Sequence, residues 1–254
     1  PLNKGYQNTG LGGKIFTKQG FDSSANTAIG YESQRDIETG YENTTLGHST
    51  LTQNKDGYKN VAVGYKSLHK NNSNYNTSIG HSSQENTNAG LNTSIGYNTL
   101  NANISGTENI AIGYNSMKDS TTGRENIGIG VYALTNNDAS ANIAIGYYSQ
   151  QSATSTQNNT TIGYKSLEET NSNDNTAVGY YSMKSKKNGF NNVAVGSNSL
   201  KKNDDGYDNV AIGYKSMINT SSNMSVAIGS HSLENTSKSE QVAIGYQSQQ
   251  SATD

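Results

Sequence analysis

The chain has 254 residues, a formal net charge of −2, no cysteine and no tryptophan, and hydrophobic residues make up only 31% of it. Ordinary globular domains are roughly 45–50% apolar, so the composition argues against a conventional core, while the small net charge does not force disorder. The absence of cysteine excludes disulfides and thiolate chemistry, the near-neutral charge argues against nucleic-acid binding, and aliphatic runs no longer than triplets such as Val61–Val63 argue against membrane insertion.

A short pattern recurs from the first residues of the chain to the last. It reads Asn, a β-branched residue, a small residue, an aliphatic residue, Gly, usually Tyr, a variable residue, Ser, and usually Leu or Met. The spacing between successive units is 16 to 18 residues, and there are fifteen units. Their glycines are Gly12, Gly30, Gly47, Gly64, Gly80, Gly96, Gly113, Gly130, Gly146, Gly163, Gly179, Gly196, Gly213, Gly229 and Gly245.

Each unit is predicted to contain one short strand ending just before its glycine. Large and small side chains alternate there with period two, as in Val61, Ala62 and Val63. We expect the two large residues to point inward, and stacking at about 4.8 Å per strand to build a continuous core. The predicted fold is all-β, a parallel β-solenoid (β-roll) of about fifteen 16–18-residue coils forming a fibre. Residues 1–254 are expected to form one repetitive domain cut from a longer fibre.

The small residue and the glycine are expected to share the opposite, outer face of the strand. Glycine permits a positive φ or a close backbone approach at a corner of the coil. The small residue, for example Ala28, Ala62 or Ala111, needs another explanation, and a second chain packed on this face supplies one. The pattern therefore predicts oligomerisation through the small-residue face.

The asparagine that opens the pattern is present in thirteen units, with Ser225 and Gln241 in the other two. Stacked amides can hydrogen-bond along a fibre axis, so a structural role is preferred over glycosylation, although Asn43, Asn76, Asn92 and Asn159 stand in Asn-x-Ser/Thr triplets. The repeat positions that best represent the structural pattern are Gly64, Gly113, Gly146, Gly213, Asn60, Asn109, Asn142 and Asn209.

The repeat resembles the head repeat of trimeric autotransporter adhesins, most closely in the segments 60–67, 109–116, 142–149 and 209–216. The resemblance implies a left-handed β-roll, a homotrimer around a common axis, an extracellular location at the cell surface, and binding to a surface glycan or matrix protein. The repeat here is longer than the family's, and its Tyr and Leu/Met positions depart from the family pattern. Similar repeats occur in virus and phage tail fibres, which leaves open a structural shaft in a virion.

Two sets of residues are candidates for surface binding. Tyrosine follows the repeat glycine in nine units, where it forms either a packing ladder or a ligand-binding stripe, and the next position is variable. Candidates at that variable position are Tyr132, Tyr148 and Tyr181. A cluster of lysines on neighbouring turns is either an anionic-glycan patch or solubilising charge, and comprises Lys184, Lys186, Lys187, Lys201 and Lys202.

No metal, cofactor or enzymatic activity is expected. The four histidines lack close sequence partners, and the turn of Asp204, Asp205 and Asp208 resembles a calcium loop only superficially. A residue that is repeated in all fifteen units indicates a structural role and not a catalytic one. The predicted function is multivalent attachment by a fibrous surface protein, with a tail-fibre shaft as the alternative. A solenoid acyltransferase and an ice-binding solenoid are weaker alternatives, because the hexapeptide period and the regular Thr-x-Thr array are missing.

Overall fold

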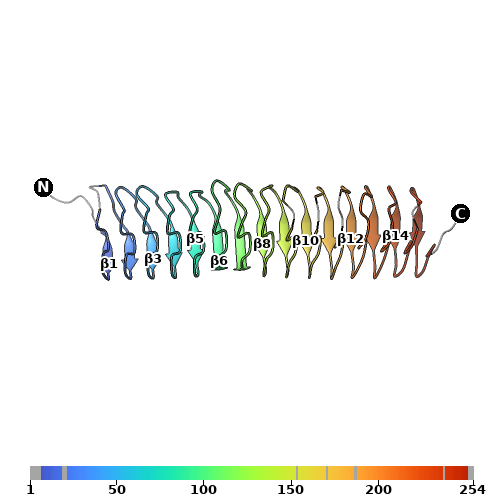
Figure 1. The fold of residues 1–254 in the computed structure, drawn as a ribbon, viewed down its shortest axis with the longest axis horizontal. Coiled ribbons are helices and arrows are strands. Elements are labelled where there is room, and N and C mark those ends of the chain that lie inside the picture. The colour runs from blue at the N-terminus through green and yellow to red at the C-terminus, as the bar shows by residue number, and fades with distance from the viewer. Residues whose placement is uncertain are drawn as a thin grey trace. The chain divides into compact units, whose positions relative to one another are not determined.

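A computed structural model describes residues 7–18, 22–152, 154–169, 171–185, 188–236 and 238–250. The chain divides into two compact units, Pro1–Glu125 and Asn126–Asp254, each of which is described by itself. The described residues contain fifteen short strands and no helix (Figure 1). The strands are β1 (Thr9–Leu11), β2 (Thr27–Ile29), β3 (Thr44–Leu46), β4 (Val61–Val63), β5 (Thr77–Ile79), β6 (Thr93–Tyr97), β7 (Ile110–Tyr114), β8 (Ile127–Ile129), β9 (Ile143–Ile145), β10 (Thr160–Ile162), β11 (Thr176–Val178), β12 (Val193–Val195), β13 (Val210–Ile212), β14 (Val226–Ile228) and β15 (Val242–Ile244).

Each unit is a stack of coils with one strand per coil, and all neighbouring strands pair in parallel. The first unit holds β1 to β7 in chain order, and the second holds β8 to β15 in chain order. The register places equivalent repeat residues side by side, so that Ile79 pairs with Ile95 and Ala211 pairs with Ala227. The predicted all-β class and the parallel β-solenoid are confirmed. Every strand covers the predicted segment before a repeat glycine, and β6 and β7 continue through Gly96 and Gly113 to the following tyrosine.

The coil closes through residues with positive φ, and the repeat glycine is one of four in each turn. In the coil of Gly64 (φ 125°), Lys59, Lys66 and Leu68 have φ of 55°, 53° and 53°. Residues other than glycine rarely adopt a positive φ, because this backbone conformation costs them roughly 1 kcal/mol or more each. Hydrogen bonds between coils offset the strain: the N–H of Lys66 donates to the carbonyl of His48 (3.0 Å), and that of Leu68 donates to the carbonyl of Ser83 (3.1 Å).

Close contact between coils explains why the corner residue is glycine. A Cβ on Gly213, whose φ is 131°, would lie 2.6 Å from the carbonyl oxygen of Gly229 in the next coil. Any side chain at this position would therefore clash with backbone atoms, in addition to adopting an unfavourable φ. The sequence interpretation of the glycines as tight corners is confirmed.

The interior of most coils contains the small strand residue, the serine and the Leu or Met of the pattern, and buried glutamines replace the Leu or Met at Gln34, Gln84 and Gln150. Ala194, Ala211, Leu200 and Met217 are all 0% exposed. In the second unit these positions merge into a single apolar cluster that comprises Leu167, Ala177, Met183, Ala194, Leu200, Ala211, Met217, Ala227, Leu233 and Ala243.

The predicted orientation of the strand side chains is wrong. The small residue points inward, whereas the large residues on either side of it face outward: Ala211 is 0% exposed, but Ile212 is 38% exposed. The reason is space, because Leu200 and Met217 already fill a coil of only 16 or 17 residues, and alanine or serine is all that fits beside them. The small residue therefore does not face another chain.

The predicted asparagine ladder, formed by the first residue of the pattern, is confirmed. Both the backbone N–H and the Nδ2 of Asn60 donate to Oδ1 of Asn43 (3.0 Å each), and Asn43 donates in the same way to Asn26. The ladder continues from Asn109 to Asn92 (2.9 Å), and in the second unit from Asn142 to Asn126 (2.9 Å) and from Asn209 to Asn192 (3.1 Å). The ladder asparagines from Asn26 to Asn209 are buried, including the four in glycosylation triplets, Asn43, Asn76, Asn92 and Asn159.

Candidate binding surface

The outward-facing large residues form an apolar stripe on each unit. We call these residues, the first and third of each strand, the outer strand face. Ile29, Ile79, Val195 and Ile228 on this face are 37–38% exposed, far more than the inner alanines. Contiguous exposed apolar surface on a protein marks an interaction site more often than isolated exposed residues do. Sequence reasoning missed this face because it placed these residues inside. The buried Leu or Met of each coil was the signal that the interior was already full.

An aromatic row runs along the first unit at the position after the repeat glycine. Neighbouring rings have centroids 4.9–5.4 Å apart, in the order Tyr31, His48, Tyr65, His81, Tyr97 and Tyr114. Each inner ring is covered by its neighbours on both faces, so the row presents ring edges to solvent, and Tyr97 is 41% exposed. The row is therefore a packing ladder, and its inner rings do not offer open faces to a ligand.

The second unit carries a wider aromatic surface. Tyr147, Tyr164 and Tyr180 stack at 5.2 and 5.3 Å, with interplanar angles of 4° and 16°. A second column lies beside this row at the variable position. In that column Tyr148 lies 4.3 Å from Tyr147 and Tyr181 lies 4.1 Å from Tyr180, while Tyr132 and Tyr148 are 5.0 Å apart. The structure thus places all three candidate tyrosines, Tyr132, Tyr148 and Tyr181, half-buried in this column.

Lysine side chains lie over the rings of the second column. The Nζ atoms of Lys184 and Lys201 lie 4.8 and 5.1 Å from the ring centroid of Tyr181, a cation–π geometry. The hydrogen bond that the Tyr181 hydroxyl donates to Tyr180, followed by partial burial, raises the pKa of Tyr181. The structure therefore brings three of the candidate residues together at one place on the second unit.

The remaining candidate lysines do not join this contact. Lys202 is exposed on the neighbouring turn, and Lys186 and Lys187 lie outside the described residues. Lys165, which sequence reasoning did not single out, lies 5.2 Å from the ring of Tyr148, and its pKa is raised by the hydrogen bond with Glu168. Glu168 pairs with Lys165 (2.7 Å) and with Lys184 (3.6 Å), so it neutralises part of the lysine cluster.

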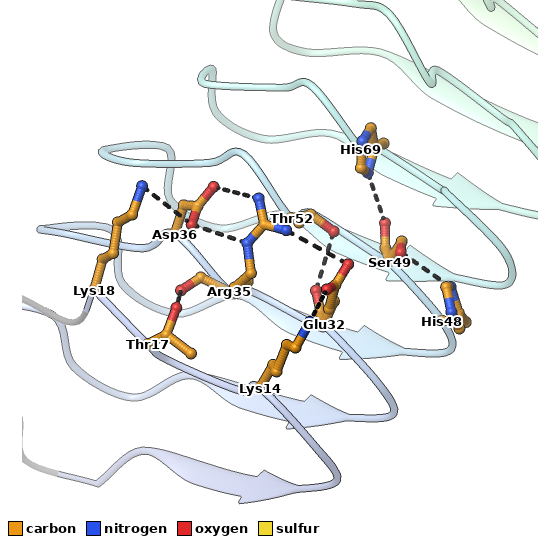
Figure 2. A network of polar contacts seen from close by, with 10 residues as sticks. All are labelled: Lys14, Thr17, Lys18, Glu32, Arg35, Asp36, His48, Ser49, Thr52 and His69. Atoms are coloured by element: carbon orange, nitrogen blue, oxygen red, sulfur yellow. Dashed lines mark hydrogen bonds and ion pairs between the residues drawn. The ribbon is translucent and has the colours of Figure 1, made fainter.

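A network of charged side chains links the first coils of the first unit (Figure 2). Arg35 donates two hydrogen bonds to Asp36 (3.0 and 2.8 Å), Lys18 approaches Asp36 from the preceding coil (3.4 Å), and Lys14 pairs with Glu32 (3.1 Å). The hydrogen bond from Arg35, together with the nearby positive charges, lowers the pKa of Asp36 despite its partial burial. Because every carboxylate here faces a cation, the network acts as a clamp between coils.

The histidines and aspartates with possible metal-binding roles have other partners. Nδ1 of His69 lies 3.2 Å from the carbonyl of Ser49, as Figure 2 shows, and burial lowers the pKa of His69. Asp205 and Asp208 accept hydrogen bonds from Asn188 (2.9 Å) and Asn191 (3.0 Å) in the preceding coil. Within the described ranges, no three His, Asp or Glu side chains form a group suited to a metal ion. The described residues also contain no helix long and apolar enough to cross a membrane.

Comparisons with known proteins assign this chain to no family. No protein-family model matches the sequence, and the comparison with curated proteins gives no match. The structure supports the coarser part of the adhesin resemblance, which is a repeat protein with a parallel β-solenoid fold.

Proposed function

We propose that this chain is a fibrous attachment protein that assembles as a homotrimer and presents a repetitive surface for multivalent binding at a cell surface. The observation that carries the proposal is the outer strand face. It bears two apolar or β-branched side chains per coil, and folding of the single chain leaves them partly uncovered: Ile162, for example, is 40% exposed.

A further copy of this chain is the occupant that fits the outer strand face best. Apolar rows on two copies have the same coil-to-coil spacing, so their side chains can interdigitate along the whole stack, which an irregular partner surface cannot do. Burying apolar area contributes about 25 cal/mol per Å², and a contact repeated in every coil accumulates stabilisation. A coil this thin also gains from sharing a core. The number of copies, three, comes from the resemblance to the adhesin head repeat.

Attachment is proposed for the surfaces that the outer strand face does not occupy. Tyrosine, lysine and polar turn residues recur along the coils, so an assembled fibre presents many similar shallow contacts. Weak contacts of this kind become useful when they are clustered, because the effective concentration of the second contact is high. The proposal therefore places the protein outside the cell, with a surface glycan or protein as its ligand.

The assembly is tested by light scattering coupled to gel filtration at micromolar concentration. We expect about three times 27.1 kDa for the wild type. Ile162→Asp with Ile212→Asp should give a folded monomer, and Lys202→Asp, a matched change at an exposed turn, should leave the trimer intact. A monomeric wild type with a normal β-sheet circular dichroism spectrum would contradict the proposed assembly.

Attachment is tested by coupling the protein to beads at increasing density and presenting the beads to whole cells. We expect retention that rises steeply with density and exceeds that of an unrelated solenoid protein. Retention absent at every density would overturn the attachment function and assign the chain to a passive shaft, as in a tail fibre.

A further inference from the structure

Between Tyr147 and Tyr246, the aromatic row of the second unit is interrupted at two coils, and the first of these breaks is at Ser197. Tyr180 and Tyr214 occupy the row on either side of Ser197, which has no ring. Two steps of the parallel stack separate these tyrosines, a distance of about 9.6 Å along the axis, where stacked rings elsewhere are one step apart. One ring position in the row, at Ser197, is therefore empty.

The two tyrosines that border Ser197 have uncovered faces. Tyr180 contacts Tyr164 in the preceding coil and Tyr181 in its own coil, while Tyr214 contacts His231 in the following coil. Within the described part of the second unit, no ring lies between Tyr180 and Tyr214. Their exposed fractions, 49% and 47%, exceed the 39% of Tyr164, which is stacked on both sides. Each of these two tyrosines therefore has a ring neighbour in the row on one side only, and its other face is turned toward Ser197.

A second interruption, at Ser230, is closed by the chain itself. The ring of His231 lies edge-on between Tyr214 (5.3 Å) and Tyr246 (6.4 Å), so it covers the space beside Ser230. At Ser197 the corresponding neighbour is Asn198, which has no ring and whose amide donates to the Ser197 hydroxyl (3.0 Å). The two breaks thus provide one open position and one filled position in the same row.

Polar and positively charged groups surround the open position. The Ser197 hydroxyl and the Asn198 amide form its floor, Lys215 lies 5.3 Å from the ring of Tyr214, and Lys201 lies 5.1 Å from the ring of Tyr181. In the described part of the chain neither Lys201 nor Lys215 has an ion-pair partner. Two acids of the second unit are engaged with other groups, Glu168 with Lys165 and Lys184, and Glu234 with His231 and Gln250.

We propose that the break at Ser197 binds a pyranose sugar that carries a carboxylate, held between Tyr180 and Tyr214 with its charge toward Lys201 and Lys215. After the half-thicknesses of two aromatic rings are subtracted, about 6 Å remains between their surfaces. This exceeds what a flat aromatic group fills and suits a puckered sugar ring, whose hydroxyls can bond to Ser197 and Asn198. The inference deepens the proposed attachment function by naming the class of ligand.

The test is a titration of the full chain with methyl β-D-glucuronide, followed by the NMR signals of the tyrosine rings. We expect saturable binding that weakens about tenfold in Ser197→Tyr, because the new ring fills the position and closes both faces. Ser230→Tyr is the matched control and should bind like the wild type, since His231 already fills that break. Lys201→Gln should weaken the glucuronide but leave the uncharged methyl β-D-glucoside unchanged.

Three results would overturn the inference. Ser197→Tyr binding the glucuronide as well as the wild type would place the sugar elsewhere. Equal affinity for glucuronide and glucoside would remove the role of the lysines, and tighter binding of benzoate would show that the break selects a flat aromatic acid. Circular dichroism and the assembly mass of each variant show whether the solenoid is intact.

The bead assay separates this inference from the proposed function. Beads retained on cells by a protein that fails to bind the glucuronide would overturn the acidic-sugar site and leave attachment standing. Glucuronide binding by a protein whose beads are never retained would support the site and overturn attachment as its purpose.

Discussion

The inside and the outside of each coil obey different constraints. Inside, nearly the same residues recur at every turn: an asparagine of the ladder, a small residue such as Ala211, a serine, and a Leu or Met such as Met217. Outside, the residues after the tyrosine row vary freely among Lys, Asn, Tyr and His. The interior repeats because every coil rests on its neighbours, and a residue that fits one coil must also fit the next.

The outer strand face is an exception, because it lies on the outside of the coil but its residues are as regular as those inside. Its residues point outward, yet the first residue of the strand is β-branched in all fifteen units. β-Branched residues favour the strand conformation, which accounts for part of this regularity. Strand preference does not require a large aliphatic third residue in such a short strand. Its recurrence therefore favours a second constraint, which is contact with another chain. The predictions below separate what the fold requires from what assembly requires.

The largest effect is expected for Gly213→Ala. The new Cβ would meet the carbonyl oxygen of Gly229, and φ of 131° is unfavourable for alanine. Gly245 has φ of 124° but nothing within 4 Å of its Cβ position, so Gly245→Ala carries only the conformational cost. We expect Gly213→Ala to lose about 4 kcal/mol or more of unfolding free energy in urea melts, and Gly245→Ala about 1–3 kcal/mol. Equal losses would show that contact between coils does not dictate the glycine.

The next largest effect is expected for Asn60→Ala in the asparagine ladder. The substitution leaves the buried N–H of Asn76 and the carbonyl of Ser73 without the hydrogen bonds that Asn60 makes (3.0 and 2.8 Å). Each buried polar group left unpaired costs about 1–3 kcal/mol, so we expect a loss of about 2–4 kcal/mol.

Asn60→Ser is the matched control for the ladder, because the chain itself uses serine at Ser225. There the hydroxyl accepts a hydrogen bond from the N–H of Gln241 (3.2 Å) and donates to the carbonyl of Asn223 (3.0 Å). We expect the loss of unfolding free energy in Asn60→Ser to be less than half of the loss in Asn60→Ala. Identical thermal unfolding of the two variants would show that the ladder amides contribute little.

A paired substitution on β13 separates the inner face from the outer face. Ala211→Leu overfills the coil interior and should cost about 1–3 kcal/mol of unfolding free energy. Ile212→Ser, one residue later and facing outward, should change the unfolding of the isolated chain by under about 1 kcal/mol but weaken self-association. Urea melts combined with sedimentation velocity measure both properties. A stable monomer from Ala211→Leu and an unfolded Ile212→Ser would reverse the assignment of the two faces.

The sequence predicted the strands, the stacking and the roles of the corner glycines and the asparagine ladder, because these depend on features repeated in every unit. It misassigned the strand faces, because alternation alone does not say which side is inside. That choice depends on the volume of the coil, which residues far from the strand, such as Leu200, occupy. The open position at Ser197 could not be predicted from the sequence, because it depends on how the residue after the serine is placed. The ring of His231 lies beside Tyr214, next to Ser230, whereas Asn198 bonds to Ser197 and has no ring.

The smallest effect is expected at the charged clamp of the first coils, where the outside of the molecule also holds coils together. The pKa of Asp36 is lowered chiefly by the hydrogen bond from Arg35, so its ionised form stabilises the folded state. This contribution is complete above the pKa of the unfolded carboxyl, near 3.8, and disappears as the pH falls through the lower folded value.

We therefore expect Asp36→Asn to be less stable than the wild type by about 0.2–1 kcal/mol at pH 7, with the difference vanishing as the pH falls through the lowered pKa of folded Asp36. Thermal unfolding of both proteins across this range checks the sign, and added salt should shrink the difference at neutral pH because the partners Lys18 and Arg35 are partly exposed. A difference that grows on acidification would mean that protonated Asp36 is the stabilising form. A difference independent of both pH and salt would mean that packing, rather than charge, joins these coils.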